Sequence, residues 1–84
     1  MSQDYGLQDA HVRIGTKQTI RTIELGLAEE VYIAQDADPR ITSKVVSLCE
    51  QSSIKITYVD TKKSLGKACG IEVGAATAAI VRQP

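Results

Sequence analysis

Residues 31–39 read Val-Tyr-Ile-Ala-Gln-Asp-Ala-Asp-Pro, and this stretch decides the fold. Its first four residues form an apolar, partly β-branched run between polar neighbours, which predicts a buried strand. The polar residues that follow predict a turn. Asp38 is expected to cap the next helix, because aspartate is favoured at helix N-termini and Pro39 suits the first helical position. The stretch therefore predicts a strand, a turn and a helix in direct succession.

The elements on either side continue this alternation. After the turn, a helix is expected to run to about Gln51, since its apolar residues recur at helical spacing. These residues are Ile41, Val45, Leu48 and Cys49. Before the strand, a helix is expected from Thr16, as its N-cap, to Leu25, with Gly26 as the stop signal. The apolar positions of this earlier segment are Ile20, Ile23 and Leu27.

Further strands and one short helix complete the pattern. Strands are expected at residues 12–14, 54–59 and 75–81, and the short helix between Asp60 and Gly70. Residues 1–10 are weakly patterned and are interpreted as a short first helix. Alternating strands and helices indicate an α/β protein, in which helices cover both faces of a sheet. We therefore expect one domain, residues 1–84, folded as a three-layer α/β/α sandwich with a mixed sheet of roughly four strands.

Composition limits the function classes. Ten cationic residues balance ten acidic ones, so the chain has no overall electrostatic footprint and any nucleic-acid site must be local. The chain has no Phe or Trp and only three Tyr, which excludes an aromatic RNA-stacking platform on the sheet. The signal-peptide pattern and an apolar run of about 18 residues are both missing, so we expect a cytoplasmic protein with no membrane partner. The sequence shows no heptad pattern and no exposed apolar helix face, so we expect a monomer.

The cations gather in two groups along the chain. The first contains Arg13, Lys17 and Arg21, and the second contains Lys62, Lys63 and Lys67. Helical spacing places Lys17 and Arg21 one turn apart near Gln18, at a helix N-terminus that favours anions. The two groups could form one site if the fold brings them together, and the alternative is an ordinary solvated charged face.

The segment Leu65–Val73 places apolar residues beside the second basic group. It ends the short helix at Gly70 and then presents Ile71 and Val73 close to lysines. Apolar side chains beside cations suit unstacked bases and their phosphates. The alternative is that Ile71 and Val73 enter the core, and the segment alone leaves both possibilities open.

Residues with reactive side chains give little support for catalysis. The chain lacks a glycine-rich nucleotide loop and a compelling Ser/His/Asp set, and His11 has no partner at metal-ligand spacing. Cys49 and Cys69 fall on apolar helical positions, which favours buried, reduced thiols. A binding protein with no catalytic residue, metal or cofactor is the favoured interpretation. A small hydrolase or thiol enzyme that uses Cys69, Asp36 and Asp38 is the weakest alternative.

Three motifs resemble a known family. They are Gly-Thr-Lys-Gln-Thr-Ile-Arg at residues 15–21, Ile-Ala-Gln-Asp-Ala-Asp-Pro at 33–39 and Leu-Gly-Lys-Ala-Cys-Gly-Ile-Glu-Val at 65–73. In this order and spacing they are similar to the kink-turn-binding ribosomal-protein family of the L-seven-Ae type, and the Thr-Lys-Gln version resembles its bacterial members. The resemblance implies an RNA-binding protein, not an enzyme, that recognises tandem sheared G·A pairs and extruded loop nucleotides. Its partner would be a kink-turn in a ribosomal RNA, a riboswitch or a small RNA, with the ribosome as a further partner.

The resemblance implies that the first motif enters the widened major groove of the kink-turn. Gly15 and Thr16 would allow close backbone approach, Lys17 and Gln18 would meet guanine edges, and Arg21 would contact phosphate or base. Lysine and glutamine can both reach the N7 and O6 acceptors of guanine. The archaeal and eukaryal pattern has Asn-Glu in place of Lys17-Gln18, so we expect affinity to rest more on charge in this chain.

The resemblance also implies roles for the later motifs. Lys62 would bind phosphate, and Ile71, Glu72 and Val73 would contact the extruded bases. Asp38 lies at a position that the family uses near RNA. An alternative function is a ribonucleoprotein or ribosome-associated scaffold, in which Ile71 and Val73 bind a partner protein.

Overall fold

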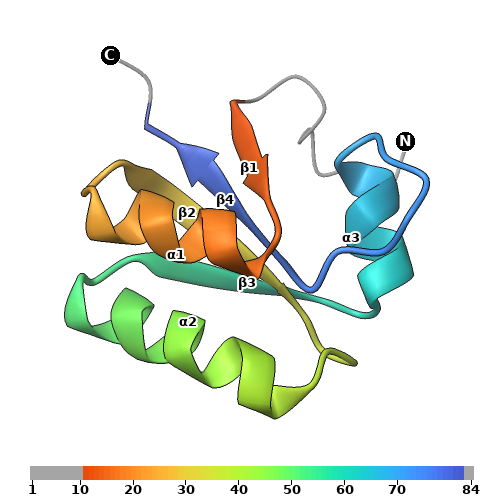
Figure 1. The fold of residues 1–84 in the computed structure, drawn as a ribbon, viewed down its shortest axis with the longest axis horizontal. Coiled ribbons are helices and arrows are strands. Elements are labelled where there is room, and N and C mark those ends of the chain that lie inside the picture. Colours follow the sequence, from red (N-terminus) through yellow and green to blue (C-terminus); the bar gives the residue numbers. More distant parts are fainter. Residues whose placement is uncertain (1–10, 83–84) are drawn as a thin grey trace.

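Four strands and three helices alternate along residues 11–82, which are the part of the chain that the computed structural model describes (Figure 1). In chain order they are β1 (Val12–Ile14), α1 (Thr16–Glu24), β2 (Ala28–Ala34), α2 (Pro39–Gln51), β3 (Lys55–Val59), α3 (Lys62–Ala68) and β4 (Thr77–Val81). The helix expected within residues 1–10 lies outside the described residues. Among residues 11–82, no helix has the length and apolar character needed to cross a membrane.

The strands form one mixed sheet in the order β1-β4-β2-β3. β2 and β3 are parallel, with Val31 opposite Ile56, whereas β4 runs antiparallel to both β1 and β2. The last strand of the chain is thus an inner strand of the sheet. Its first residues are small and fully buried, with Thr77, Ala78 and Ala79 each 0 % exposed. The expectation of a mixed sheet is confirmed.

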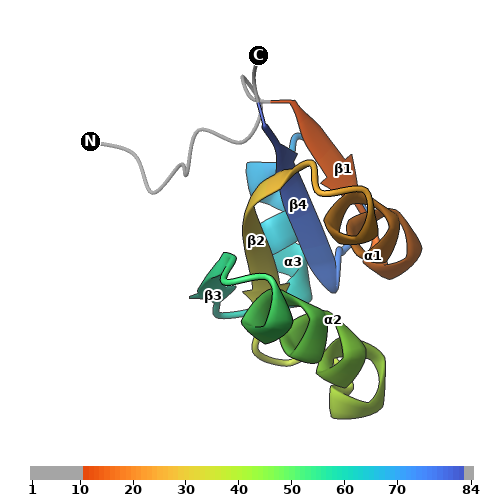
Figure 2. The same ribbon diagram turned by 90° about the vertical axis from the view of Figure 1, so that its left-hand side faces the viewer.

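Helices cover both faces of this sheet. Figure 2 shows α1 and α2 on one face and α3 on the other. Along β2, Val31 and Ile33 pack in a cluster with α1 and α2, and Tyr32 and Ala34 pack in a second cluster with α3. A strand that is buried on both faces reads as a continuous apolar run, which is the pattern of residues 31–34. The three-layer α/β/α sandwich predicted from the sequence is confirmed.

All three helices end in the same backbone motif, with a left-handed residue directly after the C-cap. These residues are Gly26 (φ 74°), Ser53 (φ 56°) and Gly70 (φ 82°). In each case the next amide donates back to the last turn; for α3, Ile71 N–H donates to the Gly66 carbonyl at 3.0 Å. This arrangement is the Schellman motif, in which glycine is preferred because it has no Cβ. The stop signals at Gly26 and Gly70 are confirmed.

Several predicted details were wrong. Thr16 is the first helical residue of α1 and not its cap, because Gly15 occupies the N-cap position with φ 105°. Ile41 and Leu27 were assigned to apolar faces but are 46 % and 45 % exposed. Ile41 lies in the first turn of α2, before the buried residues Val45 and Cys49, and Leu27 follows the end of α1.

Strand boundaries also differ from the prediction. β2 begins at Ala28, three residues before the apolar run, because Glu29 and Glu30 precede that run in the same strand. The expected strands at 54–59 and 75–81 begin later, at Lys55 and Thr77. The backbone amides of the first predicted residues bond to helices and not to a neighbouring strand. The Ile54 amide donates to the Cys49 carbonyl, and the Ala75 amide donates to the Lys62 carbonyl.

Candidate nucleic-acid interface

The sequence motifs meet at one end of the sheet, where β1, β2 and β3 finish and β4 begins. Ile14 at the end of β1 pairs with Ala78, and Ile33 near the end of β2 pairs with Thr77. The parallel partner of β2 finishes at the same end, since Ala34 pairs with Val59. We call this region the site end of the sheet. It carries the start of α1, the turn of residues 35–38 and the start of α3, and the segment of residues 70–76 leads from the far end of α3 back to it (Figure 1).

The start of α1 is fixed to β4 at the site end. The Gly15 amide donates to the Thr77 carbonyl at 2.9 Å. The Thr77 hydroxyl oxygen lies 3.2 Å from that of Thr19 and 3.4 Å from that of Thr16. Thr19 and Thr77 are both 0 % exposed, so these polar contacts are shielded from water. Buried hydroxyl contacts have strong positional requirements, and they hold the first turn of α1 in one place.

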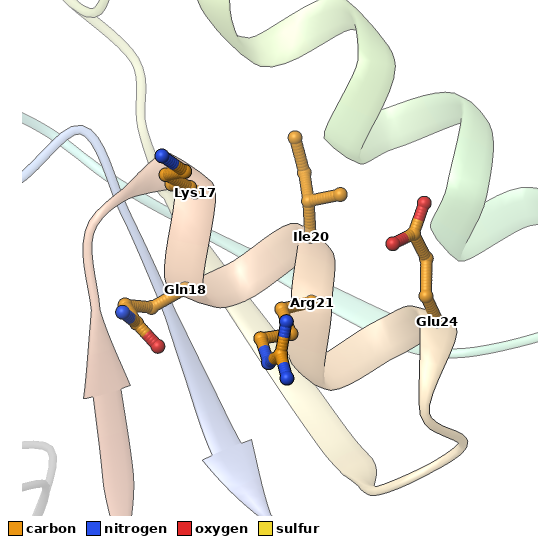
Figure 3. Close-up of a pocket in the computed structure, with 5 residues that line it drawn as sticks. All are labelled: Lys17, Gln18, Ile20, Arg21 and Glu24. Atoms are coloured by element: carbon orange, nitrogen blue, oxygen red, sulfur yellow. The ribbon is translucent and has the colours of Figure 1, made fainter.

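The outer face of α1 is polar and open. Lys17, Gln18, Ile20, Arg21 and Glu24 line an open hollow of about 420 Å³ (Figure 3). Gln18 and Arg21 point to the same side of the helix, and Lys17 stands at its start. The first turn contains no acidic residue, and Gly15 has no side chain to cap the helix. The helix N-terminus therefore carries a positive dipole end next to an exposed lysine, an arrangement that suits an anion.

The sequence left open whether Ile71 and Val73 are exposed or enter the core, and in the structure the two residues differ. Ile71 is half-buried and packs against the cluster that includes Leu65. Val73 is 70 % exposed, and Glu72 is also exposed. The prediction of an exposed apolar side chain therefore holds for Val73, whereas Ile71 serves partly in the core.

Lys62 joins this segment to the turn after β2. Its amide donates to the Asp36 carboxylate at 2.7 Å, and its carbonyl accepts from the Ala75 amide at 3.0 Å. Its side chain is exposed, as is that of Lys17 on α1. One member of each basic group thus lies at the site end. Lys67 lies in the last turn of α3, away from the start of that helix.

The Asp38 carboxylate caps α2, the helix that follows it. Its carboxylate accepts from the Arg40 amide at 2.9 Å and pairs with the Arg40 guanidinium at 2.9 Å. The guanidinium, together with the backbone N–H of the same residue, holds the pKa of Asp38 below its usual value. The predicted N-cap role of Asp38 is confirmed. An RNA contact by the same carboxylate stays a prediction.

The cysteines are buried, as the sequence indicated. Cys49 lies at the end of α2 and Cys69 at the end of α3, and both are free thiols. Burial raises the pKa of each thiol, because the charged thiolate loses hydration. A raised pKa lowers the fraction of nucleophilic thiolate at neutral pH.

Sequence reasoning missed four residues that shape the site end. Asp36 was considered only with Asp38 as a weak acid-base pair, yet it bonds the start of α3. Thr77 was treated as an ordinary strand residue. Neither Gly66 nor Gly74 was predicted to be a close-packing position, but a Cβ on either would press on neighbouring backbone or side-chain atoms. A glycine inside a helical pattern was the available signal for Gly66, since such a residue usually has a packing reason.

Comparison with known proteins agrees with this arrangement. The sequence profile of the ribosomal protein L7Ae/L30e/S12e/Gadd45 family matches residues 6–84. An RNA-binding protein of Geobacillus sp. (strain WCH70) is 48 % identical over 82 residues, which cover 98 % of this chain and 100 % of that protein. The RNA-binding protein YbxF of Geobacillus stearothermophilus is 49 % identical, with the same coverage of both chains.

A solved structure supports the same relationship. The Giardia lamblia 15.5kD RNA binding protein superposes with a TM-score of 0.81 at 30 % identity, and the match covers 89 % of this chain and 62 % of that chain. The shared fold and the extent of the sequence match lead to one conclusion: the chain belongs to the ribosomal protein L7Ae/L30e/S12e/Gadd45 family.

Proposed function

We propose that this protein binds RNA, and that it recognises and stabilises the kinked form of kink-turn motifs. The observation that carries the proposal is that the α1 surface and the segment of residues 71–73 are both connected to the start of β4 at the site end. The start of α1 is bonded to Thr77, and the segment that ends at Thr77 displays Val73. Relatives at nearly 50 % identity are RNA-binding proteins.

The α1 surface provides groups that suit the major groove at sheared G·A pairs. Lys17 and Gln18 are exposed donors that can reach guanine N7 and O6. The adjacent helix N-terminus suits a phosphate, and Arg21 lies one turn further along the same helix. Gly15 and Thr16 have no bulky side chain, so RNA can approach the backbone closely at this surface.

The segment of residues 71–73 provides the second surface. Val73 offers apolar area for unstacked bases, and Ile71 and Glu72 precede it. Lys62 lies beside the next residue, Gly74, and supplies a cation for phosphate. RNA with a kink presents both the G·A pairs and the extruded nucleotides at once. A protein that binds only this form shifts the equilibrium of the RNA towards it. We further propose that the protein acts as a cytoplasmic monomer.

Binding and bending can be measured together. A duplex RNA with a kink-turn, labelled for energy transfer between its arms, is titrated with the protein beside a duplex whose sheared G·A pairs are changed to Watson–Crick pairs. We expect tight binding and a rise in transfer for the kink-turn alone. Equal, weak binding to both RNAs contradicts the proposal and favours a scaffold role through protein contacts.

Single variants separate the two surfaces. Lys17→Ala and Val73→Ser are each expected to weaken kink-turn binding by about threefold to tenfold. Val73 is a better probe than Ile71, because Ile71 also packs against the core. Leu25→Ser is the matched control for Val73→Ser, since Leu25 is 59 % exposed at the far end of α1. It should leave RNA binding unchanged.

A further inference from the structure

Gly66 lies inside α3 and is buried against the segment that follows the helix. A Cβ at this position would collide with the carbonyl oxygen of Val73, and it would lie 3.1 Å from the Val73 carbonyl carbon and 3.2 Å from the Gly74 Cα. These are backbone atoms, so no side-chain rotation can relieve the contact. Any other residue at position 66 must push the segment away from the helix.

The same segment is tied to α3 at two further points. The Ile71 amide donates to the Gly66 carbonyl, and the Ala75 amide donates to the Lys62 carbonyl, each at 3.0 Å. Gly74 lies close to Lys62, since a Cβ on Gly74 would be 3.2 Å from the Lys62 Cβ. Residues 71–75 therefore return along the helix from Gly66 to Lys62, as Figure 1 shows for the trace beside α3.

This packing explains how Val73 is displayed. Its carbonyl faces Gly66, while its side chain is 70 % exposed. Glycine is the least favourable residue inside a helix apart from proline, so the helix itself gains nothing from Gly66. The gain lies in the close approach of the segment, which fixes the backbone at the residue whose side chain faces solvent.

We propose that Gly66 is a positioning residue that sets the shape of residues 71–74 and thereby the preference for RNA with extruded bases. This inference rests on the proposed kink-turn function and names the residue that specifies one half of the surface. Gly66 is buried and makes no RNA contact of its own. It acts through the position of Val73.

The test combines protein variants with RNA variants. Gly66→Ala is compared with the wild type and with Gly26→Ala, a control substitution of the glycine that follows α1 at the end of the sheet opposite the site. A Cβ on Gly26 meets nothing within 4 Å, but its φ of +74° strains an alanine, so this variant loses stability without touching the site. The RNAs are an intact kink-turn, the same RNA with abasic extruded nucleotides, and the RNA with Watson–Crick pairs in place of the G·A pairs.

The wild type and Gly26→Ala are expected to bind the abasic RNA about tenfold more weakly than the intact kink-turn. Gly66→Ala is expected to bind the intact RNA about tenfold more weakly and to lose no more than about twofold on the abasic RNA, while it still rejects the Watson–Crick RNA through α1. A role in stability alone would instead give both alanine variants the same RNA preference.

Two results overturn the inference. One is a folded Gly66→Ala protein that keeps the full difference between intact and abasic RNA. The other is a wild type that binds kink-turn and Watson–Crick RNA equally, which overturns the proposed function at the same time. If Gly66→Ala does not fold, Gly74→Ala decides the matter, because its contact with Lys62 is milder. It should reduce the preference for intact RNA by roughly threefold, and an unchanged preference contradicts the inference.

Discussion

The Asp36 carboxylate accepts a hydrogen bond from the Lys62 backbone N–H at 2.7 Å, which links the turn after β2 to the first residue of α3. This bond spans the site end between two segments that are 26 residues apart in the sequence. It places a negative charge beside a surface that is proposed to meet RNA phosphates. The hydrogen bond is expected to stabilise the fold, whereas the negative charge is expected to weaken RNA binding.

Two substitutions of Asp36 separate these consequences. Asp36→Asn keeps an oxygen acceptor for the Lys62 amide and removes the charge, so stability should change by less than about 0.5 kcal/mol and RNA binding should tighten. Asp36→Ala removes the acceptor as well and should lower the free energy of unfolding by about 1 kcal/mol. Urea denaturation and RNA titration measure the two effects. Equal stability of the two variants would show that the bond contributes nothing.

Lys17 and Gln18 replace the Asn-Glu pair expected in archaeal and eukaryal relatives, and salt dependence should report this difference. The double variant Lys17→Asn with Gln18→Glu removes one cation from the α1 surface that we propose meets RNA and adds one anion to it. Its plot of log affinity against log salt concentration should be shallower by about one unit. Lys55→Ala is the control, because Lys55 begins β3 at the end away from the site. Identical slopes for wild type and double variant would refute an electrostatic contribution of Lys17 to RNA binding.

Ser53 offers a stability prediction that is independent of RNA. It occupies the left-handed position after α2 with φ 56°, where its Cβ crowds the backbone. Ser53→Gly should raise the free energy of unfolding by about 1 kcal/mol. Ser52→Gly is the matched control, since Ser52 has φ −102° and gains no relief from glycine. Chemical denaturation of both variants tests the prediction, and a gain for Ser52→Gly alone would contradict it.

Asp38 makes part of the stability depend on pH. Its pKa is lowered in the folded protein, chiefly by the Arg40 side chain and then by the Arg40 amide. A lowered pKa means that the carboxylate stabilises the fold above its unfolded pKa of about 4, and that this contribution disappears as pH falls through the lower folded value. Asp38→Asn keeps a capping oxygen but does not titrate.

The difference in stability between wild type and Asp38→Asn should therefore be present at pH 6 and shrink as pH falls below about 4. Urea midpoints measured across that range provide the test. A difference that stays constant down to pH 2 would mean that the Arg40 contact does not depend on the charge of Asp38.

Local signals in the sequence were sufficient for much of the fold. Residues 31–34 predicted a buried strand, and Asp38-Pro39 predicted the start of α2, because both patterns depend on neighbouring residues alone. Gly26 and Gly70 marked helix ends for the same reason. Strand order was beyond such signals, since it depends on which strands pair across the chain.

The candidate site shows the same division. The exposed position of Lys17 followed from helical spacing, whereas the exposure of Val73 could not be separated from that of Ile71 by sequence alone. Ile71 packs against the buried cluster that includes Leu65, whereas the backbone of Val73 lies against Gly66, a close approach of backbone atoms that no side-chain pattern encodes. Thr16 was wrongly predicted as the cap because Gly15 occupies the N-cap position. The amide of Gly15 is held by the Thr77 carbonyl, which is distant in the sequence.

The inner position of β4 has a consequence for the order of folding during synthesis. β1 pairs with β4 and not with β2, so β1 has no partner in the sheet until residues 77–81 have left the ribosome. A nascent chain stalled before Thr77 should lack cooperative structure and bind no kink-turn RNA, which pulse proteolysis and RNA capture on stalled complexes can measure. Recognition would then switch on only when translation of the sheet is complete, and an unfinished chain could not occupy the RNA in place of a finished one.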